Sequence, residues 1–329
     1  MNKQLLTSLF CLLALGCSEK PSELNQEYQQ RLANTLELEH QPSANLSNPT
    51  LEKVPLPESD ITISVLDIAS LGHCKVTNLI AQHNNQLGKV SYPSERLKYH
   101  IRFIQLAPAC AEHPKTSEKV AAALTTAVAE KTAQLPHYFM HMMSFERELQ
   151  VLGVLTRDEV PIDNVSLHGK TLEAIEQLAE MASHLKEPQK LDPEALTPAL
   201  EVLSQRYIPS LLSSVRKQSQ YNRTTTAMLE QVELEQTLCQ PQGNRERAEI
   251  LNNVFSKFYL KQLQPYQASL TNLLAEVEKA WLPIAQLYHE QGVTPPIAPA
   301  KHLNELKQSA KAHVTWWQKF YKLCEITPL

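Results

Sequence analysis

Glycine is scarce in this chain. Its 329 residues include only 7 glycines, whereas average usage of about 7% would give roughly 23. β-Sandwiches, β-barrels and phosphate-binding α/β sheets need glycine at turns and at close backbone approaches. The 21 prolines lie between stretches of helical periodicity, where they are expected to end helices. The composition therefore predicts an all-α protein.

An excess of one charge is also missing. Basic residues number 31 and acidic residues 35, and the formal net charge is −4 at pH 7. Without a basic stripe, no nucleic-acid partner is expected. The G-x-S-x-G, H-E-x-x-H and G-x-x-x-x-G-K-[ST] signatures are absent as well. Acid pairs such as Glu146 with Glu148 are typical of solvated helix faces. These absences favour a protein that is not an enzyme.

After residue 17, no apolar run reaches the length of about 20 residues that a membrane span requires. The first 17 residues read MNKQLLTSLFCLLALGC. Lys3 supplies a positive start, residues 5–15 form a short apolar stretch, and Gly16 precedes Cys17. This order is typical of a secretory signal that is removed from the mature protein.

The end of this segment, residues 14–17, resembles the lipobox of bacterial lipoproteins, except that Ala14 replaces the commoner leucine. The resemblance implies cleavage after residue 16 and a covalent lipid on Cys17, and two or more acyl chains anchor a protein stably. Ser18, in place of aspartate, resembles lipoproteins sorted to the outer membrane. We therefore expect a protein anchored by lipid to the cell envelope, at the outer membrane and facing the periplasm. A soluble periplasmic protein with another cleavage site is the alternative.

Four cysteines remain after the signal: Cys74, Cys110, Cys239 and Cys324. An even number in an oxidising compartment predicts two disulfides. Of the three possible pairings, we favour Cys74–Cys110 and Cys239–Cys324, because each joins parts of the chain expected to pack as neighbours. A four-thiolate zinc site is the alternative, but the C-x-x-C spacing of such sites is absent. No cofactor is expected apart from the lipid on Cys17.

Apolar periodicity and proline positions predict the helices. The expected ranges are 22–39 with Ser22 as N-cap, 61–87 as one helix, 94–108, 116–133 ended by Pro136, 137–155, 172–185, two helices within 194–236 that meet near Pro209, 244–283, and 301–324. Residues 40–60 have the composition of a linker. The predicted organisation is a signal (1–16), a lipidated N-terminus with a short helix and linker (17–60), and a helical domain (61–329). No internal repeat is visible, so we expect an irregular antiparallel multi-helix bundle with an extended N-terminal linker.

The segment HYFMHMMSF, residues 137–145, contains a candidate metal site. His137 and His141 lie one helical turn apart and project from one face, which is a metal-pair spacing. Together with Met140 they offer imidazole and thioether ligands, which suit copper. Methionine is also a routine core residue, and we favour a core segment with histidines at its edge.

A second polar group occurs around the turn between 61–87 and 94–108. Asn85, Ser94, Arg96 and Tyr99 could line a pocket or form a structural network between the two helices, and we favour the network.

The surrounding residues carry a family resemblance. Residues 71–110 read LGHCKVTNLIAQHNNQLGKVSYPSERLKYHIRFIQLAPAC, in the order Cys, N-x-x-L-G-K, P-S-x-R-L-x-Y, Cys. With the lipobox and the run YQQRLAN at 28–34, the chain resembles a gammaproteobacterial lipoprotein family, domain of unknown function 3080. The resemblance implies an envelope lipoprotein with a helical fold. It implies no activity, cofactor or partner.

The sequence thus favours a lipid-anchored, periplasm-facing helical protein that acts as an interaction or scaffolding module in the envelope. Its expected partners are the membrane, through the lipid, and an envelope protein. The alternative function is binding of a small ligand, a lipid or a metal in a cavity between helices.

Overall fold

The computed structural model describes residues 20–39, 46–58, 65–84, 91–161, 167–239 and 245–327. The α-helices are α1 (Pro21–Leu36), α2 (Val65–Ala69), α3 (Lys75–Asn84), α5 (Pro93–Ala111), α6 (Glu118–Phe145), α7 (His168–Ser183), α8 (Leu196–Leu203), α9 (Tyr207–Leu229), α10 (Leu234–Thr237), α11 (Arg245–Val254), α12 (Gln264–Glu290) and α13 (Pro299–Cys324). Two 3₁₀ turns, η1 (Pro188–Lys190) and η2 (Pro193–Ala195), and a π-helical segment, η3 (Phe255–Leu263), complete them. No strand occurs in these ranges. The predicted all-α bundle is confirmed.

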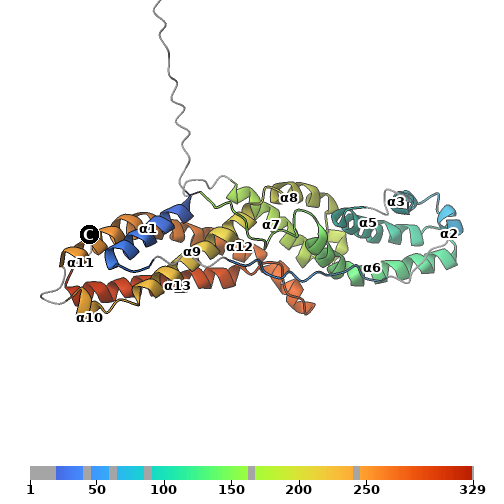
Figure 1. Cartoon of the computed structure of the whole chain (residues 1–329). Coiled ribbons are helices and arrows are strands. Elements are labelled where there is room, and N and C mark those ends of the chain that lie inside the picture. The colour runs from blue at the N-terminus through green and yellow to red at the C-terminus, as the bar shows by residue number, and fades with distance from the viewer. Residues whose placement is uncertain are drawn as a thin grey trace, which may run out of the picture.

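The bundle is long and narrow, with α2 and α3 at one end and α10 and α11 at the other (Figure 1). Its described residues form three hydrophobic clusters. The tip cluster joins α3, α5 and α6 and includes Leu71, Val76, Ile80, Phe103, Ala107, Val120 and Leu124. The central cluster joins α5 to α9 and α12 and includes Ile101, Phe139, Ile175, Leu211, Leu274 and Trp281. The terminal cluster joins α1, α11, η3 and α13 and includes Leu32, Leu251, Phe255, Phe258, Trp317 and Phe320.

A buried polar layer lies where α9, α12 and α13 pass from the central to the terminal cluster. The amide nitrogen of Gln267 donates to the amide oxygens of Gln218 (3.1 Å) and Asn222 (3.0 Å). The Asn222 amide in turn donates to the Ser309 hydroxyl at 3.3 Å. A buried amide that loses its partner costs about 1–3 kcal/mol. The layer therefore penalises any sliding of one helix past another.

His313 of α13 is fully buried. Its hydrogen bonds link α1 and α9 to this polar layer. Its Nε2 accepts from the Tyr28 hydroxyl (2.9 Å) and the Trp317 indole (3.2 Å). Its Nδ1 lies 3.1 Å from the Thr226 hydroxyl, whose own proton goes to the Asn222 carbonyl. Since the indole can only donate, these contacts select the neutral imidazole with its proton on Nδ1. Burial lowers the pKa of His313 to about 3.

An uninterrupted helix runs from Arg245 to Glu290 through α11, η3 and α12. It contributes residues to both the central and the terminal cluster. It widens into η3 immediately before Pro265. Proline has no N–H to donate, and its ring clashes with the carbonyl four residues earlier. The preceding N–H, on Gln264, reaches back five residues to the Tyr259 carbonyl. The π-helical turn thus accommodates Pro265 without ending the helix.

Several predicted boundaries are wrong. The helix expected over 61–87 is divided, because a turn around Gly72 separates α2 from α3. The break expected at Pro136 is absent, since α6 runs through it. A proline inside a helix costs about 3 kcal/mol. The apolar side chains on both sides of Pro136 are buried in the central cluster, which offsets that cost. Pro283 lies within α12 for the same reason.

The start of α1 also differs from the prediction. Pro21 is its first residue and Lys20 precedes it, so Ser22 lies inside the first turn. The Glu23 carboxylate accepts from the Lys20 N–H at 3.1 Å. A proline with its fixed φ is well suited to the first helical position.

Residues 46–58, predicted as part of a linker, pack along the bundle without regular secondary structure. Val54 is buried in the central cluster. The Asn48 side chain accepts from the Leu155 N–H at 2.7 Å, and Glu52 accepts from the Thr294 N–H at 3.0 Å. Beside them, a Cβ on Gly153 would lie 2.5 Å from the Pro296 carbonyl oxygen. Glycine is therefore required at that approach.

Both favoured disulfides are present. Cys74, just before α3, is joined to Cys110 in the last turn of α5, so this disulfide links the two helices of the tip hairpin, α3 and α5. Cys239, after α10, is joined to Cys324 at the end of α13.

Replacing His313 by glutamine is expected to make stability less sensitive to acid. The folded pKa of about 3 lies below the unfolded value of about 6.5. The stability contributed by neutral His313 is therefore present above about pH 6.5 and lost as pH falls toward about 3. Between about pH 4 and 6, the slope of unfolding free energy against pH should decrease by about 1.4 kcal/mol per pH unit in H313Q. Urea unfolding at several pH values measures it, and an unchanged slope would contradict the assignment.

Candidate functional site

A cluster of imidazole and aromatic rings lies between α3, α5 and α6, where the central and tip clusters meet. His83 stacks on Tyr99 with ring centroids 3.7 Å apart and planes 8° from parallel. His100 stacks on Tyr138 with centroids 3.8 Å apart. Such separations leave no room for a ligand between the paired rings.

Lys131 of α6 holds a positive charge in this ring cluster. Its Nζ lies 3.2 Å from His100 Nδ1, and 5.7 Å and 5.4 Å from the ring centroids of Tyr99 and Phe103. An ammonium group only donates, so His100 accepts through Nδ1 and is neutral. Cations within about 6 Å of an aromatic face are attracted by the ring quadrupole.

Burial is the main cause of the altered pKa values here. It lowers the pKa of His100 well below the usual range, with Lys131, His83 and Arg96 lowering it further. Burial also lowers the pKa of Lys131. It raises the pKa of Tyr99 to about 12, with a smaller contribution from Tyr138. The arrangement keeps one cation and one neutral imidazole together, and its contacts pack three helices against each other.

The polar residues predicted around the hairpin are divided between two places. Tyr99 joins the ring cluster, and the charge of Arg96 acts on it. Ser94 lies at the start of α5, where its N–H donates to a buried Glu146 carboxylate at 2.7 Å. A carboxylate is stabilised at a helix N-terminus. Asn85 lies outside the described residues, so the predicted network of all four is untested.

The candidate copper ligands have other contacts. The ring N–H of His137 donates to the Pro55 carbonyl (3.1 Å) and that of His141 to the Val54 carbonyl (2.9 Å). Met140 is buried in the central cluster. The two histidines therefore hold residues 46–58 against α6. Copper binding stays a prediction.

An open groove of about 560 Å³ runs between α7 and α12. Its floor is apolar, with Leu172, Ala179 and Ala280, and its rim carries charged side chains: Glu176, Glu180, Glu276 and Lys279. Its volume falls in the range of ligand sites, about 300–1,000 Å³.

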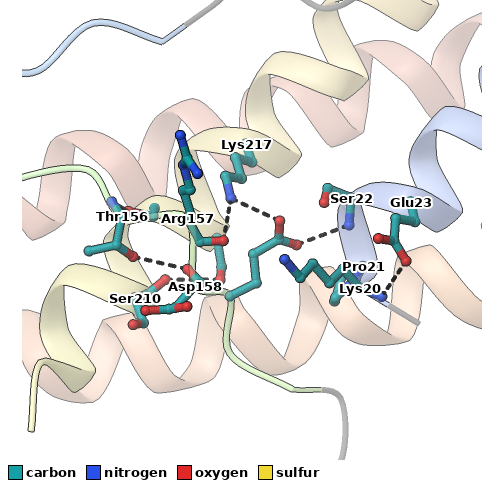
Figure 2. Close-up of polar contacts among 12 residues, drawn as sticks. Lys20, Pro21, Ser22, Glu23, Thr156, Arg157, Asp158, Ser210 and Lys217 are labelled. Carbon is teal, nitrogen blue, oxygen red and sulfur yellow. Dashed lines mark hydrogen bonds and ion pairs between the residues drawn. The ribbon is translucent and has the colours of Figure 1, made fainter. Parts of the chain in front are cut away.

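The start of α1 is fixed to the bundle by Glu159. Figure 2 shows Ser22 of α1 and Lys217 of α9, the two residues that Glu159 joins. Its carboxylate accepts from the Ser22 N–H at 2.9 Å and from Lys217 of α9 at 2.8 Å. The Glu159 side chain is only 2% exposed. Lys217 also reaches the Arg157 carbonyl at 3.3 Å. Cys17, the predicted lipidation site, lies outside the described residues.

The ring cluster as a whole and Glu159 are not predicted from the sequence. The ring cluster has a signal in the sequence, because its residues lie at helical spacing on each helix. On α5 they are residues 96, 99, 100 and 103, and on α6 they are residues 131 and 138. For Glu159 there was none, since it lies in irregular backbone far in sequence from Ser22.

In the part of the chain that the structure describes, no helix has the length and hydropathy to cross a membrane.

Replacing Lys131 by methionine should raise the pKa of His100, because a positive charge that lowers it is removed. The rise should stop short of the ordinary value, since burial remains. NMR titration of the His100 ring measures the shift. K119M, on the same helix at the exposed pair with Asp67, is the matched control and should leave His100 unchanged. Equal behaviour of the two variants would contradict the contact.

Removing both His137 and His141 as alanines should loosen residues 46–58. Each lost hydrogen bond is worth about 1 kcal/mol, so amide exchange in this segment should accelerate by roughly 10- to 30-fold. H184A is the control, because the His184 ring bonds the Glu180 carbonyl within its own helix end. Unchanged exchange in the double variant would show that the histidines do not hold the segment.

Comparison with known proteins gives one family and no individual relatives. The family model described as "Protein of unknown function (DUF3080)" matches residues 25–328. No curated protein and no solved structure matches the chain. The match begins inside α1 and ends after α13, so it spans all three hydrophobic clusters. The chain is a member of the DUF3080 family.

Proposed function

We propose that this protein is a lipid-anchored, periplasm-facing interaction or scaffolding module of the cell envelope. The lipobox-like residues 14–17 support the anchor. The two disulfides suit an oxidising compartment. The long, narrow bundle supports a module that can contact partners at separated places.

The position of the α1 start carries this proposal. Helix α1 begins at Pro21, close behind Cys17, and its first turn lies on the flank of the bundle, away from both ends (Figure 1). The three residues between them span at most about 14 Å. Because Glu159 fixes the first turn of α1 to α9, a lipid on Cys17 would hold the flank near the membrane. Both ends of the bundle would then remain free to meet partners along the membrane plane.

A second candidate function is binding of a small ligand, a lipid or a metal between helices. The groove between α7 and α12, with its apolar floor and volume of about 560 Å³, is the observation that favours it.

A depth measurement on vesicles tests the anchor geometry. A fluorophore at Arg157, beside the α1 start, should be quenched by lipid-attached quenchers more strongly than one at Lys115 near the tip. Inserting about 20 Gly/Ser residues before Lys20 should remove the difference, because such a linker is flexible. C17S should not bind vesicles at all. Vesicle binding by C17S, or equal quenching at both sites, would contradict the geometry.

Photo-crosslinking in cells tests the interaction role itself. A crosslinking residue replaces Tyr92 or Leu282, large apolar side chains that are 69% and 54% exposed. We expect a specific envelope protein to be captured from at least one position, and capture to weaken in C17S because the chain leaves the membrane. If neither position yields a specific protein adduct, the scaffolding role is contradicted.

A further inference from the structure

We propose that the tip of the bundle is a zinc site that the Cys74–Cys110 disulfide keeps closed. One ligand atom from each of His73, Cys74 and Cys110 lies within 4.8 Å of the other two. Once the disulfide is reduced, the set becomes one imidazole and two thiolates. Zinc favours nitrogen and sulfur ligands of this kind, and three protein ligands plus a water complete its tetrahedral coordination.

The tautomer of His73 suits metal binding. Its Nε2 lies 3.0 Å from the Thr116 hydroxyl, and that hydroxyl donates its own proton to the Cys110 carbonyl at 2.7 Å. The Thr116 oxygen therefore accepts from His73 Nε2–H, which leaves Nδ1 without a proton. An imidazole oriented by such an outer hydrogen bond is the usual form of a metal-binding histidine.

The backbone that carries these ligands is held independently of the disulfide. Cys74 and Cys110 are buried, with 9% and 4% exposure, among the apolar side chains of the tip cluster. The Cys74 N–H bonds the Leu71 carbonyl at 2.8 Å, and the Thr77 hydroxyl bonds the same carbonyl at 2.5 Å. These two bonds fix the turn before α3, and the apolar contacts of the tip cluster pack that turn against α5. His73 is partly exposed, which gives an ion a path from solvent.

His113 lies nearby but is not assigned as a ligand. Its ring contacts that of His73 at a tilt of 34°, with centroids 4.4 Å apart. Its Nδ1 already accepts from the Lys115 N–H at 3.2 Å, so the proton of the neutral ring is on Nε2. Neither nitrogen is then available without breaking that contact. This difference between two adjacent histidines supplies a matched control.

Opening the site needs a two-electron reductant, such as a dithiol. The dithiol transfers two electrons and two protons to the disulfide, which gives two cysteine thiols, and is itself oxidised to a disulfide. On metal binding each thiol releases its proton to water and the sulfurs coordinate as thiolates. Zinc does not change oxidation state. The oxidised protein should therefore bind no zinc here.

Cobalt(II) titration of the full mature chain tests the site. The background is C239S/C324S, so that only one disulfide remains to be reduced, and a phosphine serves as reductant. The reduced protein should bind one equivalent of cobalt, with the visible bands of tetrahedral coordination and thiolate charge transfer in the near ultraviolet. Zinc should displace it, and the oxidised protein should show no such bands.

The two histidine variants decide the assignment. H73Q should lose stoichiometric binding, whereas H113Q should retain it, and both keep the disulfide so that folding can be verified before reduction. The proposal is overturned if reduced protein binds no cobalt although its helical circular dichroism persists. It is equally overturned if H73Q binds like the parent, or if C74S/C110S binds with the same spectrum.

Discussion

The central constraint in this structure is the layer of bonded amides and hydroxyls that α9, α12 and α13 share. Each helix is apolar on either side of the layer and polar within it, as Gln218, Gln267 and Ser309 show. Apolar contacts alone tolerate sliding, because many registers bury similar area. Directional bonds do not, and satisfied buried networks specify one arrangement. The positions of the central and terminal clusters relative to each other therefore depend on these few polar side chains.

A comparable junction separates the central cluster from the tip. There the ring cluster around Lys131 replaces the amides, and stacking and cation–π contacts replace hydrogen bonds. The bundle thus alternates apolar clusters with polar junctions along its length. Two histidines with strongly lowered pKa values lie at these junctions, His100 at one and His313 at the other. Burial between the packed helices is the main cause of both shifts. Perturbed groups mark functional sites only probabilistically, since structural networks perturb pKa values too.

The sequence predicted the fold class, most helices and both disulfides, because these depend on local periodicity, glycine content and cysteine number. It failed where distant packing decides the outcome. Pro136 is expected to end a helix and Pro283 to kink or end one, although burial in the central cluster carries the helix through both. The hydrogen-bond partners of the α6 histidine pair were not predictable, because they are the carbonyls of residues 54 and 55, more than eighty positions earlier. The partners of Gln218 and Asn222 on α12 and α13 were not predictable either, because they lie at least 45 positions away.

The contact between Tyr28 and His313 has a consequence for the order of events in synthesis. The two residues are 285 positions apart, so α1 is complete long before its packing surface exists. Helix α1 cannot bury Tyr28 or Leu32 until nearly the last turn of α13 has been made, because Trp317 and Phe320 close the terminal cluster. The tip hairpin, whose cysteines are 36 positions apart, can form much earlier. Helix α1 is thus synthesised early but packs late. A chain that stops short of α13 leaves the apolar face of α1 exposed.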